Sequence, residues 1–360
     1  MHGGGIYYPV DELLRIAEVK ITNGLKGMIA YLGALHPLRT AEELLMMFME
    51  ISASHNYCSK LVYEVGCDAE KIEIRDLKKN TETQSYIAYQ ADGGRVRTRE
   101  DICLGKLSKK VFRILDLCLT GSIKEIKISD EEKQRYSKEL NPWIESKTTL
   151  ITNGVDLVQN TVVDRNWEIA MDDFAKEIKS KGHNTSPCNQ ALISDGATHI
   201  QDHFAKHFPD TEQILDEFHF SEHLNLSARL TFPDNVIERK QWVKSCKGLA
   251  FANDSTTLLE RISNAKSNQS DKDVKEALRL LYNYVDKNKE RIRYGYFRDK
   301  GLPIGSGEVE ATIKTMNDTK KIKRASTRWR KHRLSKTVAI RSVVFNSQFE
   351  ELATKIKKVA

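Results

Sequence analysis

The sequence predicts an α/β protein in which a sheet is flanked by helices, with an all-α insertion and an N-terminal helical region. Three observations point to this class. Short β-prone segments at 85–91, 191–193 and 213–215 alternate with segments of helical pattern. Residues 1–80 have helical character. Residues 225–300 contain no good strand.

The N-terminal region, residues 1–80, is expected to hold a possible helix-turn-helix. Thr40 and Glu43 have the spacing of a capping box, and the apolar run 44–51 follows them. A short break precedes a second helix over about 55–72. Two helices across so short a turn fit a helix-turn-helix, and an ordinary helical hairpin fits as well.

Residues 81–224 are expected to form the first part of the core. The two glycines after Asp92 predict a hairpin turn. Further strands are expected at 95–99, 109–117 and 148–155, with a surface excursion over 125–150. Helices are expected at 167–180 and 198–208. The strands 191–193 and 213–215 lead to Asp195 and Asp216.

Residues 225–304 are expected to be a helical insertion. Val274, Ala277, Leu278, Leu281 and Val285 recur at helical spacing and form one apolar face. The glycine-rich turn 301–307 then leads into residues 305–360, where a long helix beginning near Glu308 would carry a basic surface. From 314 to 336 there are ten Lys/Arg and one acid, a net charge of +9 within a total of +7. So local an excess favours a polyanion that binds at one place.

Three acidic residues are candidates for a metal site. Asp92 and Asp195 each follow a β-prone segment and precede glycine, which would leave the carboxylate at the rim of a sheet. Glu310 follows the Gly-Ser-Gly at 305–307. Carboxylates are the protein ligands that Mg²⁺ prefers, and two Mg²⁺ ions promote phosphodiester cleavage. Because the chain has 50 acidic residues, spacing alone does not single these three out.

Six segments, in order along the chain, carry a resemblance to a known family. They are YYPVDELL (7–14), YIAYQADGGRVRTRE (86–100), ALISDGATHI (191–200), FPDTEQILDEFHFSEHL (208–224), GLPIGSGEVEATIK (301–314) and KIKRASTRW (321–329). The chain resembles the DDE transposases of bacterial insertion sequences in the Kra branch, relatives of the Mutator-like group. The resemblance implies an RNase H-like mixed sheet flanked by helices, interrupted by the all-α insertion.

The resemblance also implies site residues. Asp92 and Asp195 match the two catalytic aspartates, and Glu310 matches the glutamate, so these three would hold two Mg²⁺ (or Mn²⁺) ions. Glu308 is the rival of Glu310, because side chains two positions apart on a helix do not share a face. Asp216 and His219 match a D-x-x-H pair that would support the site. The expected DNA contacts are Lys320, Lys321, Lys323, Arg324, Arg328, Trp329, Arg330, Lys331 and Arg333.

The expected function is therefore DNA transposition. The enzyme would cleave double-stranded DNA at element ends, join it to a target, and act as a homo-oligomer in the bacterial cytoplasm at the nucleoid. The family's N-terminal extension with CxxC pairs is expected to be missing, which leaves two alternatives. One is a truncated or inactive DNA-binding copy. The other is a metal-dependent RNase H-like nuclease that does not join strands.

Other classes are excluded by composition. Six scattered cysteines without a CxxC pair argue against a disulfide framework and a zinc ribbon. The longest strongly apolar run, 44–51, is too short to span a bilayer. The first residues do not have the basic and apolar regions of a signal peptide. A soluble protein of two or three units without membrane contact is expected from 360 residues, of which 40% are hydrophobic and 30% charged.

Overall fold

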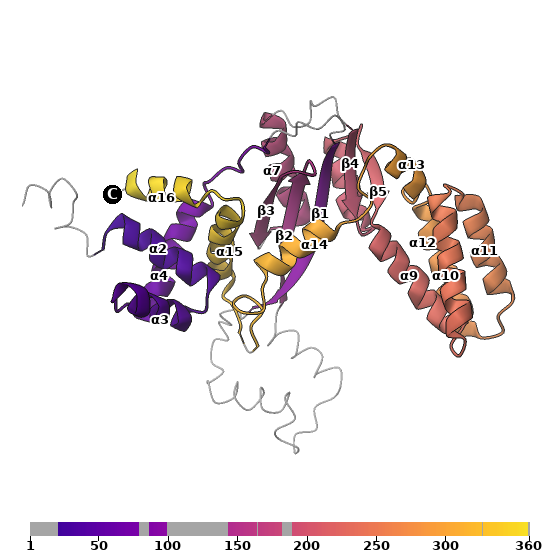
Figure 1. Ribbon diagram of the computed structural model, residues 1–360, viewed down its shortest axis with the longest axis horizontal. Helices are drawn as coiled ribbons and strands as arrows, with labels where there is room; N and C mark the ends of the chain where they lie inside the picture. The colour runs from indigo at the N-terminus through magenta and orange to yellow at the C-terminus, as the bar shows by residue number, and fades with distance from the viewer. Residues whose placement is uncertain are drawn as a thin grey trace, which may run out of the picture.

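The computed structural model describes residues 21–78, 86–98, 143–163, 165–181, 189–325 and 327–358. Its centre is a five-stranded mixed sheet in the order β3-β2-β1-β4-β5 (Figure 1). The strands are β1 (Tyr86–Arg97), β2 (Trp143–Thr152), β3 (Leu157–Val163), β4 (Asn189–Ser194) and β5 (Glu212–Leu215). The first three form an antiparallel meander, and β4 and β5 run parallel to β1. This order and these directions define an RNase H-like sheet, so the predicted fold class is confirmed.

β1 is longer than we predicted, and our prediction of a hairpin turn after Asp92 is wrong. The strand continues through the two glycines, with Asp92 opposite Thr148 and Gly94 opposite Ser146 of β2. A β-carbon at Gly93 would collide with Glu145, and one at Gly94 would collide with the Asn317 side chain. The glycines therefore make room for packed neighbours within a strand. β2 also begins earlier than expected, and the predicted strand 109–117 lies outside the described residues.

One face of the sheet is covered by α7 (Trp167–Ser180) and α8 (Thr198–His207). Both helices match their predicted ranges closely. Tyr89 of β1 points to this face and stacks on Phe208, with ring centroids 4.6 Å apart. Because side chains alternate along a strand, Gln90 and Asp92 point to the opposite face.

The opposite face is covered by α14 (Gly307–Met316) and α15 (Lys331–Phe345). Val309 and Ile313 of α14 pack on Leu150 of β2. The long helix that we predicted from Glu308 is wrong, because α14 ends at Met316 and a turn-rich segment separates it from α15. In that segment the Trp329 N–H donates to the Arg97 carbonyl oxygen at 3.1 Å, and Trp329 forms a parallel bridge with Thr98. The chain therefore pairs with the end of β1 at a place where we expected helix.

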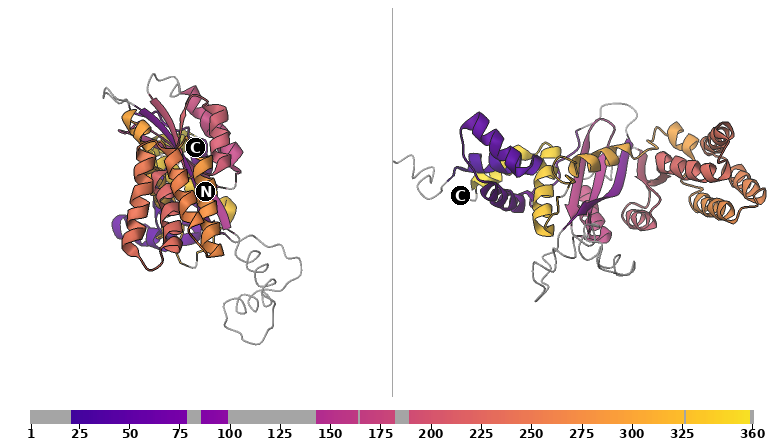
Figure 2. Two further views of the ribbon diagram at one scale, coloured as in Figure 1. Left: turned by 90° about the vertical axis from the view of Figure 1, so that its right-hand side faces the viewer. Right: turned by 90° about the horizontal axis from the view of Figure 1, so that it is seen from below.

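The insertion is entirely helical in its described residues and projects from the β5 side of the sheet (Figure 2). Its helices are α9 (Glu217–Thr231), α10 (Val236–Phe251), α11 (Ser255–Ser267), α12 (Lys272–Lys287) and α13 (Tyr294–Asp299). The predicted apolar face of α12 is real, since Leu278, Leu281 and Val285 are buried. α9 begins eight residues before 225 and connects directly to β5.

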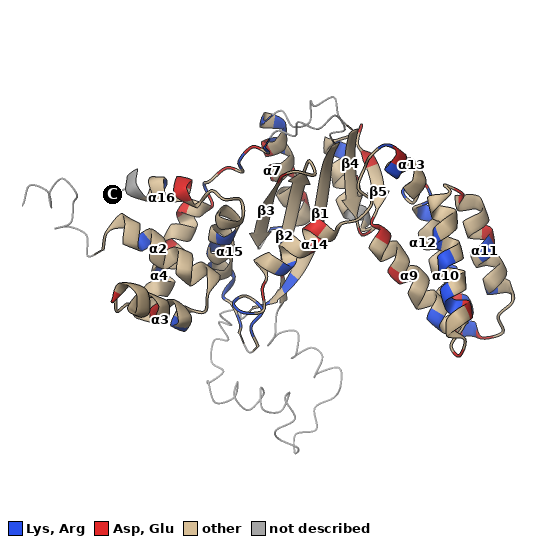
Figure 3. Ribbon diagram, viewed as in Figure 1, with Lys and Arg blue, Asp and Glu red and all other residues tan. Residues whose placement is uncertain are grey.

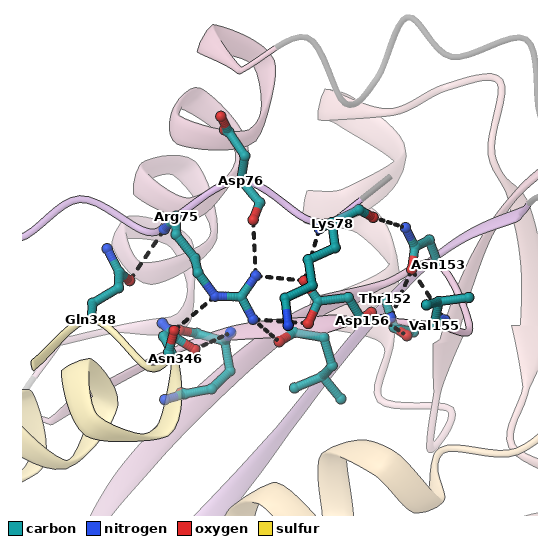
Figure 4. A network of polar contacts seen from close by, with 11 residues as sticks. Arg75, Asp76, Lys78, Thr152, Asn153, Val155, Asp156, Asn346 and Gln348 are labelled. Carbon is teal, nitrogen blue, oxygen red and sulfur yellow. Dashed lines mark hydrogen bonds and ion pairs between the residues drawn. The ribbon is translucent and has the colours of Figure 1, made fainter. Parts of the chain in front are cut away.

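The N-terminal helices form a layer with the C-terminal helices on the β3 side. They are α2 (Asn23–Leu35), α3 (Leu38–Met49) and α4 (His55–Ala69), and they pack with α15 and α16 (Phe349–Lys358). Arg75 attaches this layer to the sheet (Figure 4): its Nη2 donates to Asp156 Oδ1 at 2.8 Å and its Nε to the Asn346 carbonyl at 2.7 Å. No helix in the described ranges has the length and apolar character that a bilayer crossing requires.

Candidate active site

Asp92 lies in the middle of β1, on the face covered by α14. Its carboxylate is half-buried, and Oδ1 accepts the Gly93 N–H at 2.6 Å. The pKa of Asp92 is raised to about 6, mainly by burial and also by the negative charges of Asp195 and Glu310, whereas the Gly93 bond and His219 lower it. The site therefore gathers negative charge in a partly desolvated place.

Asp195 directly follows β4 and lies beside Asp92. Gln90 of β1 is the register partner of Ile193 of β4. Because the two strands are parallel, Asp92 and Asp195, which lie two residues further along each chain segment, are neighbours. Asp195 Oδ1 accepts the Ala197 N–H at 3.0 Å, and Gly196 has a φ of +91°, which a side chain rarely allows. The predicted turn after Asp195 is therefore present, unlike the one after Asp92.

Glu310 is brought to the same place by the first turn of α14. It is half-buried, and one of its oxygens lies within 4.8 Å of ligand atoms of Asp216 and His219. Lys314, one turn later, donates to Glu310 Oε2 at 3.3 Å. Asp195, after β4, and Glu310, in α14, both raise the pKa of Asp92 in β1, whereas the ligand atoms that lie within 4.8 Å of one another are those of Asp216, His219 and Glu310.

Glu308 faces a different partner. Its Oε2 accepts the Gln90 side-chain N–H at 3.0 Å, and Gln90 Oε1 accepts the Val309 N–H at 3.1 Å. Burial is the main reason why the pKa of Glu308 is raised. These paired bonds hold α14 on β1 and use the Glu308 carboxylate to do so. Gln90, which sequence reasoning missed, therefore sets the position from which Glu310 reaches Asp92.

Asp216 is fully buried and serves as the N-cap of α9. Its Oδ1 accepts the backbone N–H groups of Phe218 and His219, and its Oδ2 accepts that of Ser306 at 2.9 Å. Burial raises its pKa, and these three bonds act in the opposite direction. Since both oxygens are occupied by backbone donors, Asp216 joins the start of α9 to the start of α14. It thereby fixes the approach of His219 to Glu310.

Arg291, between α12 and α13, was also missed by sequence reasoning. It is 8% exposed, and its Nη2 donates to Ser194 Oγ at 2.9 Å, next to Asp195. One more arginine in a chain of 57 Lys/Arg has no local signature. Only the fold shows that its guanidinium contacts Ser194, the residue before Asp195.

The predicted DNA-contact residues divide into internal and exposed groups. Lys321 is buried, and its ammonium donates to the Gly33 carbonyl at 2.6 Å, so our expectation that it lies on the DNA-facing surface is wrong. Burial lowers its pKa to about 8. Arg333 donates to Ser59 of α4, and Trp329 donates its indole N–H to the Ile322 carbonyl at 2.9 Å. These residues hold the segment in place.

The exposed part of the basic segment lies beside α14, where Figure 3 shows Lys and Arg along the connection to α15. The exposed predicted residues are Lys320, Lys323, Arg324, Arg328 and Arg330, and Lys331 is half-buried. The Trp329 bridge places this segment against the end of β1, where Arg95 and Arg97 are also exposed. The basic surface is thus extended by two arginines that we did not predict.

Comparisons with known proteins give similarities to solved structures. No family model matches the sequence, and no curated protein matches it. The chain is similar to a solved structure of the Drosophila P element transposase strand transfer complex, at 10% sequence identity and a TM-score of 0.31. The similarity covers 97% of this chain and 87% of that one. The fold class stated above is defined by the order and direction of the strands.

The donor set fits hard divalent cations. The gathered ligands are carboxylate oxygens with one imidazole, and within the described part of the chain the group that could hold a metal is Asp216, His219 and Glu310. Asp92 and Asp195 are not part of this group, and Asp216 within it already accepts three backbone N–H bonds. These residues fit Mg²⁺ or Mn²⁺.

Proposed function

We propose that this protein is a DNA transposase that cleaves and joins strands by metal-dependent phosphoryl transfer. The observation that carries the proposal is the raised pKa of Asp92 on an RNase H-like sheet, to which the charges of Asp195, after β4, and Glu310, in α14, contribute. Metal-assisted attack on a phosphodiester needs convergent carboxylates of this kind. The exposed basic segment directly after α14 supports DNA as the substrate.

Asp92, Asp195 and Glu310 would hold two Mg²⁺ or Mn²⁺ ions. When bound, such ions activate an attacking water or 3′-hydroxyl and stabilise the leaving oxygen. The raised pKa of Asp92 means that this carboxyl holds a proton more readily than a surface aspartate does. Cation binding must displace that proton, so occupancy would fall as the pH drops below about 6.

His219 and Asp216 would support the site without replacing the three carboxylates. The His219 ring pairs with Glu222 one turn later, with Nδ1 3.3 Å from the carboxylate oxygen, which fixes the orientation of the imidazole. Asp216 holds the backbone of His219 and Ser306. We assign His219 to orienting the scissile strand at the carboxylates, and Asp216 to holding α9 and α14 together.

The exposed basic residues would hold the DNA over the carboxylates. Lys320, Lys323 and Arg324 follow α14 by only a few positions, and they are exposed. Arg95 and Arg97 continue this surface along the end of β1. Binding of element ends and target by a homo-oligomer in the bacterial cytoplasm belongs to the same proposal.

The test is a cleavage and joining assay with DNA that carries the sequences flanking the encoding gene. We expect the wild type to cut and join it with Mg²⁺ or Mn²⁺, and Asp92→Asn, Asp195→Asn and Glu310→Gln to lose both activities while still binding DNA. Asp210→Asn, at an exposed acid between α8 and β5, is the matched control. DNA binding without cleavage by the wild type would refute the enzyme in favour of a DNA-binding protein. Cleavage without joining would identify a nuclease.

A further inference from the structure

Arg291 is a buried cation whose charge is not neutralised by a direct partner. Its Nη1 donates to Asn288 Oδ1 at 2.7 Å, and its Nη2 to Ser194 Oγ and to the Ile214 carbonyl at 3.2 Å. Its Nε has no hydrogen-bond partner among the described residues. These acceptors are uncharged, and no carboxylate in the described ranges forms an ion pair with Arg291. A buried guanidinium in this state is costly and needs a compensating role.

The nearby negative charge of Asp195 offsets part of this cost. Burial lowers the pKa of Arg291 to about 10, so the group remains charged at neutral pH, and the negative charge of Asp195 acts to keep it so. Asp195 and Glu310 in turn both repel the Asp92 carboxylate and raise its pKa. A fixed positive charge near Asp195 lowers the cost of keeping Asp195 charged beside Asp92 before a cation arrives.

Arg291 also connects the two strands that end at the site. Ser194, its partner on β4, immediately precedes Asp195, and Ile214, its partner on β5, lies two residues before Asp216. The Arg291 backbone carbonyl accepts the Leu215 N–H at 3.0 Å. Three hydrogen bonds of Arg291, which belongs to the insertion, therefore hold the C-terminal ends of β4 and β5 in place.

A second residue of the insertion reinforces this attachment. The Tyr294 hydroxyl donates to the Leu215 carbonyl at 3.0 Å, and the Tyr294 side chain is fully buried. Tyr284 of α12 lies against Gly196, on the other side of Asp195. Two tyrosines of the insertion thus contact the backbone on either side of the site, at Leu215 and at Gly196.

We propose that Arg291 is a positioning residue of the active site, through which the helical insertion sets the affinity of the carboxylates for divalent cations. The proposal deepens the proposed function and rests on it for the identity of the cations. Arg291 touches neither substrate nor metal. It acts through Ser194 and Ile214, which hold the ends of β4 and β5, and through its charge.

The experiment is a Mn²⁺ titration of the full chain followed by electron paramagnetic resonance. We expect Arg291→Met to bind Mn²⁺ about tenfold or more weakly, the usual effect of removing a group that supports metal ligands. Arg291→Lys keeps the charge and should recover part of the affinity. The matched control is Arg293→Met, because Arg293 lies over the Tyr296 ring at 4.5 Å and contacts its own turn. Wild-type affinity in a folded Arg291→Met protein, as judged by circular dichroism, would overturn the proposal.

Ser194→Ala covers the case in which Arg291→Met does not fold. It removes the Arg291 acceptor next to Asp195 and leaves the buried cation in place, so we expect a smaller loss of Mn²⁺ affinity in a folded protein. Unchanged affinity in this variant would count against the positioning role. The readout is independent of DNA. A wild type that binds Mn²⁺ yet cuts no DNA would refute the proposed transposase activity. If the wild type does cut DNA and the Arg291 variants bind Mn²⁺ with unchanged affinity, only the positioning role is refuted.

Discussion

Asp92 is a proposed carboxylate ligand whose charged form is disfavoured in the folded protein. Its pKa is raised from 3.8 to about 6 by burial and by the charges of Asp195 and Glu310, with His219 acting in the opposite direction. The folded state therefore holds this proton at pH values where the unfolded chain has released it. Stability contributed by the protonated form is complete below about pH 4 and is lost as the pH rises through 6.

Replacing Asp92 should consequently stabilise the protein when no cation is present. We expect Asp92→Asn to raise the free energy of unfolding by about 1–2 kcal/mol at pH 7.5 in chelator, less than the full shift because the group is partly solvated. The difference should shrink toward pH 4, where the wild-type carboxyl is protonated. Chemical denaturation at the two pH values measures it. Equal stability of the two proteins at both would contradict the electrostatic account.

Glu308 and Glu310 should separate in a metal-binding experiment. We expect Glu310→Gln to weaken Mn²⁺ binding about tenfold or more, because it removes a proposed ligand. Glu308→Gln should leave the affinity nearly unchanged, since a glutamine oxygen can still accept the Gln90 N–H. Isothermal titration of both variants, each checked for folding, makes the comparison. The reverse order of effects would assign the third carboxylate to Glu308.

At this scale the sequence indicates some residues and conceals others. Asp92 and Asp195 stand out because each follows a β-prone run and precedes glycine, and Glu310 because of the Gly-Ser-Gly before it. Gln90 and Arg291 have no such local mark. Their roles depend on partners about a hundred or more positions away, such as Glu308 for Gln90 and Ser194 for Arg291.

At the scale of elements, the predictions were wrong where the same local sequence pattern is compatible with two different structures. A glycine pair after aspartate marks a hairpin in many chains, and here Gly93 and Gly94 lie within β1 under the side chains of Glu145 and Asn317. The helical pattern after Glu308 was likewise real only as far as Met316. Beyond it, the bridge between Thr98 and Trp329 competes with helix, and no local pattern reports that contact.

One ion pair contributes to the attachment of the N-terminal layer to the sheet. Arg75 binds both carboxylate oxygens of Asp156 in the turn between β2 and β3, and this holds the pKa of Asp156 at about 2 (Figure 4). The unfolded chain has an ordinary aspartate pKa. The stability that this pair contributes is therefore present above about pH 4 and is lost as the pH falls through 2.

Asp156→Asn should weaken that attachment. We expect the free energy of unfolding to fall by about 1–3 kcal/mol at pH 7, because Arg75 loses a charged partner in a half-buried place. The gap between variant and wild type should narrow below pH 3, where Asp156 of the wild type begins to protonate. Urea denaturation at both pH values checks this, with the exposed Asp210→Asn as control. A gap that is the same at both would rule out the ion pair as its cause.

At the scale of the whole molecule, the basic surface should determine how DNA binding responds to salt. Neutralising Lys320, Lys323 and Arg324 together with glutamine should reduce the slope of log affinity against log salt by about 2–3, since each phosphate contact contributes about 0.9. The matched control removes three charges from exposed residues of the insertion, Lys272, Lys275 and Arg279. Fluorescence anisotropy at several salt concentrations measures both slopes. An equal change in the two variants would show that the effect is one of total charge.

The position of α14 in the chain has a consequence for protein synthesis. Asp92 and Asp195 precede the insertion, whereas Glu310 follows it near residue 310 of 360. A ribosome that stalls anywhere in the insertion releases a product with both aspartates and without the proposed third ligand. If the protein cleaves DNA as proposed, such a product would be unable to cut the genome of the cell, and cleavage would begin only after α14 has been synthesised.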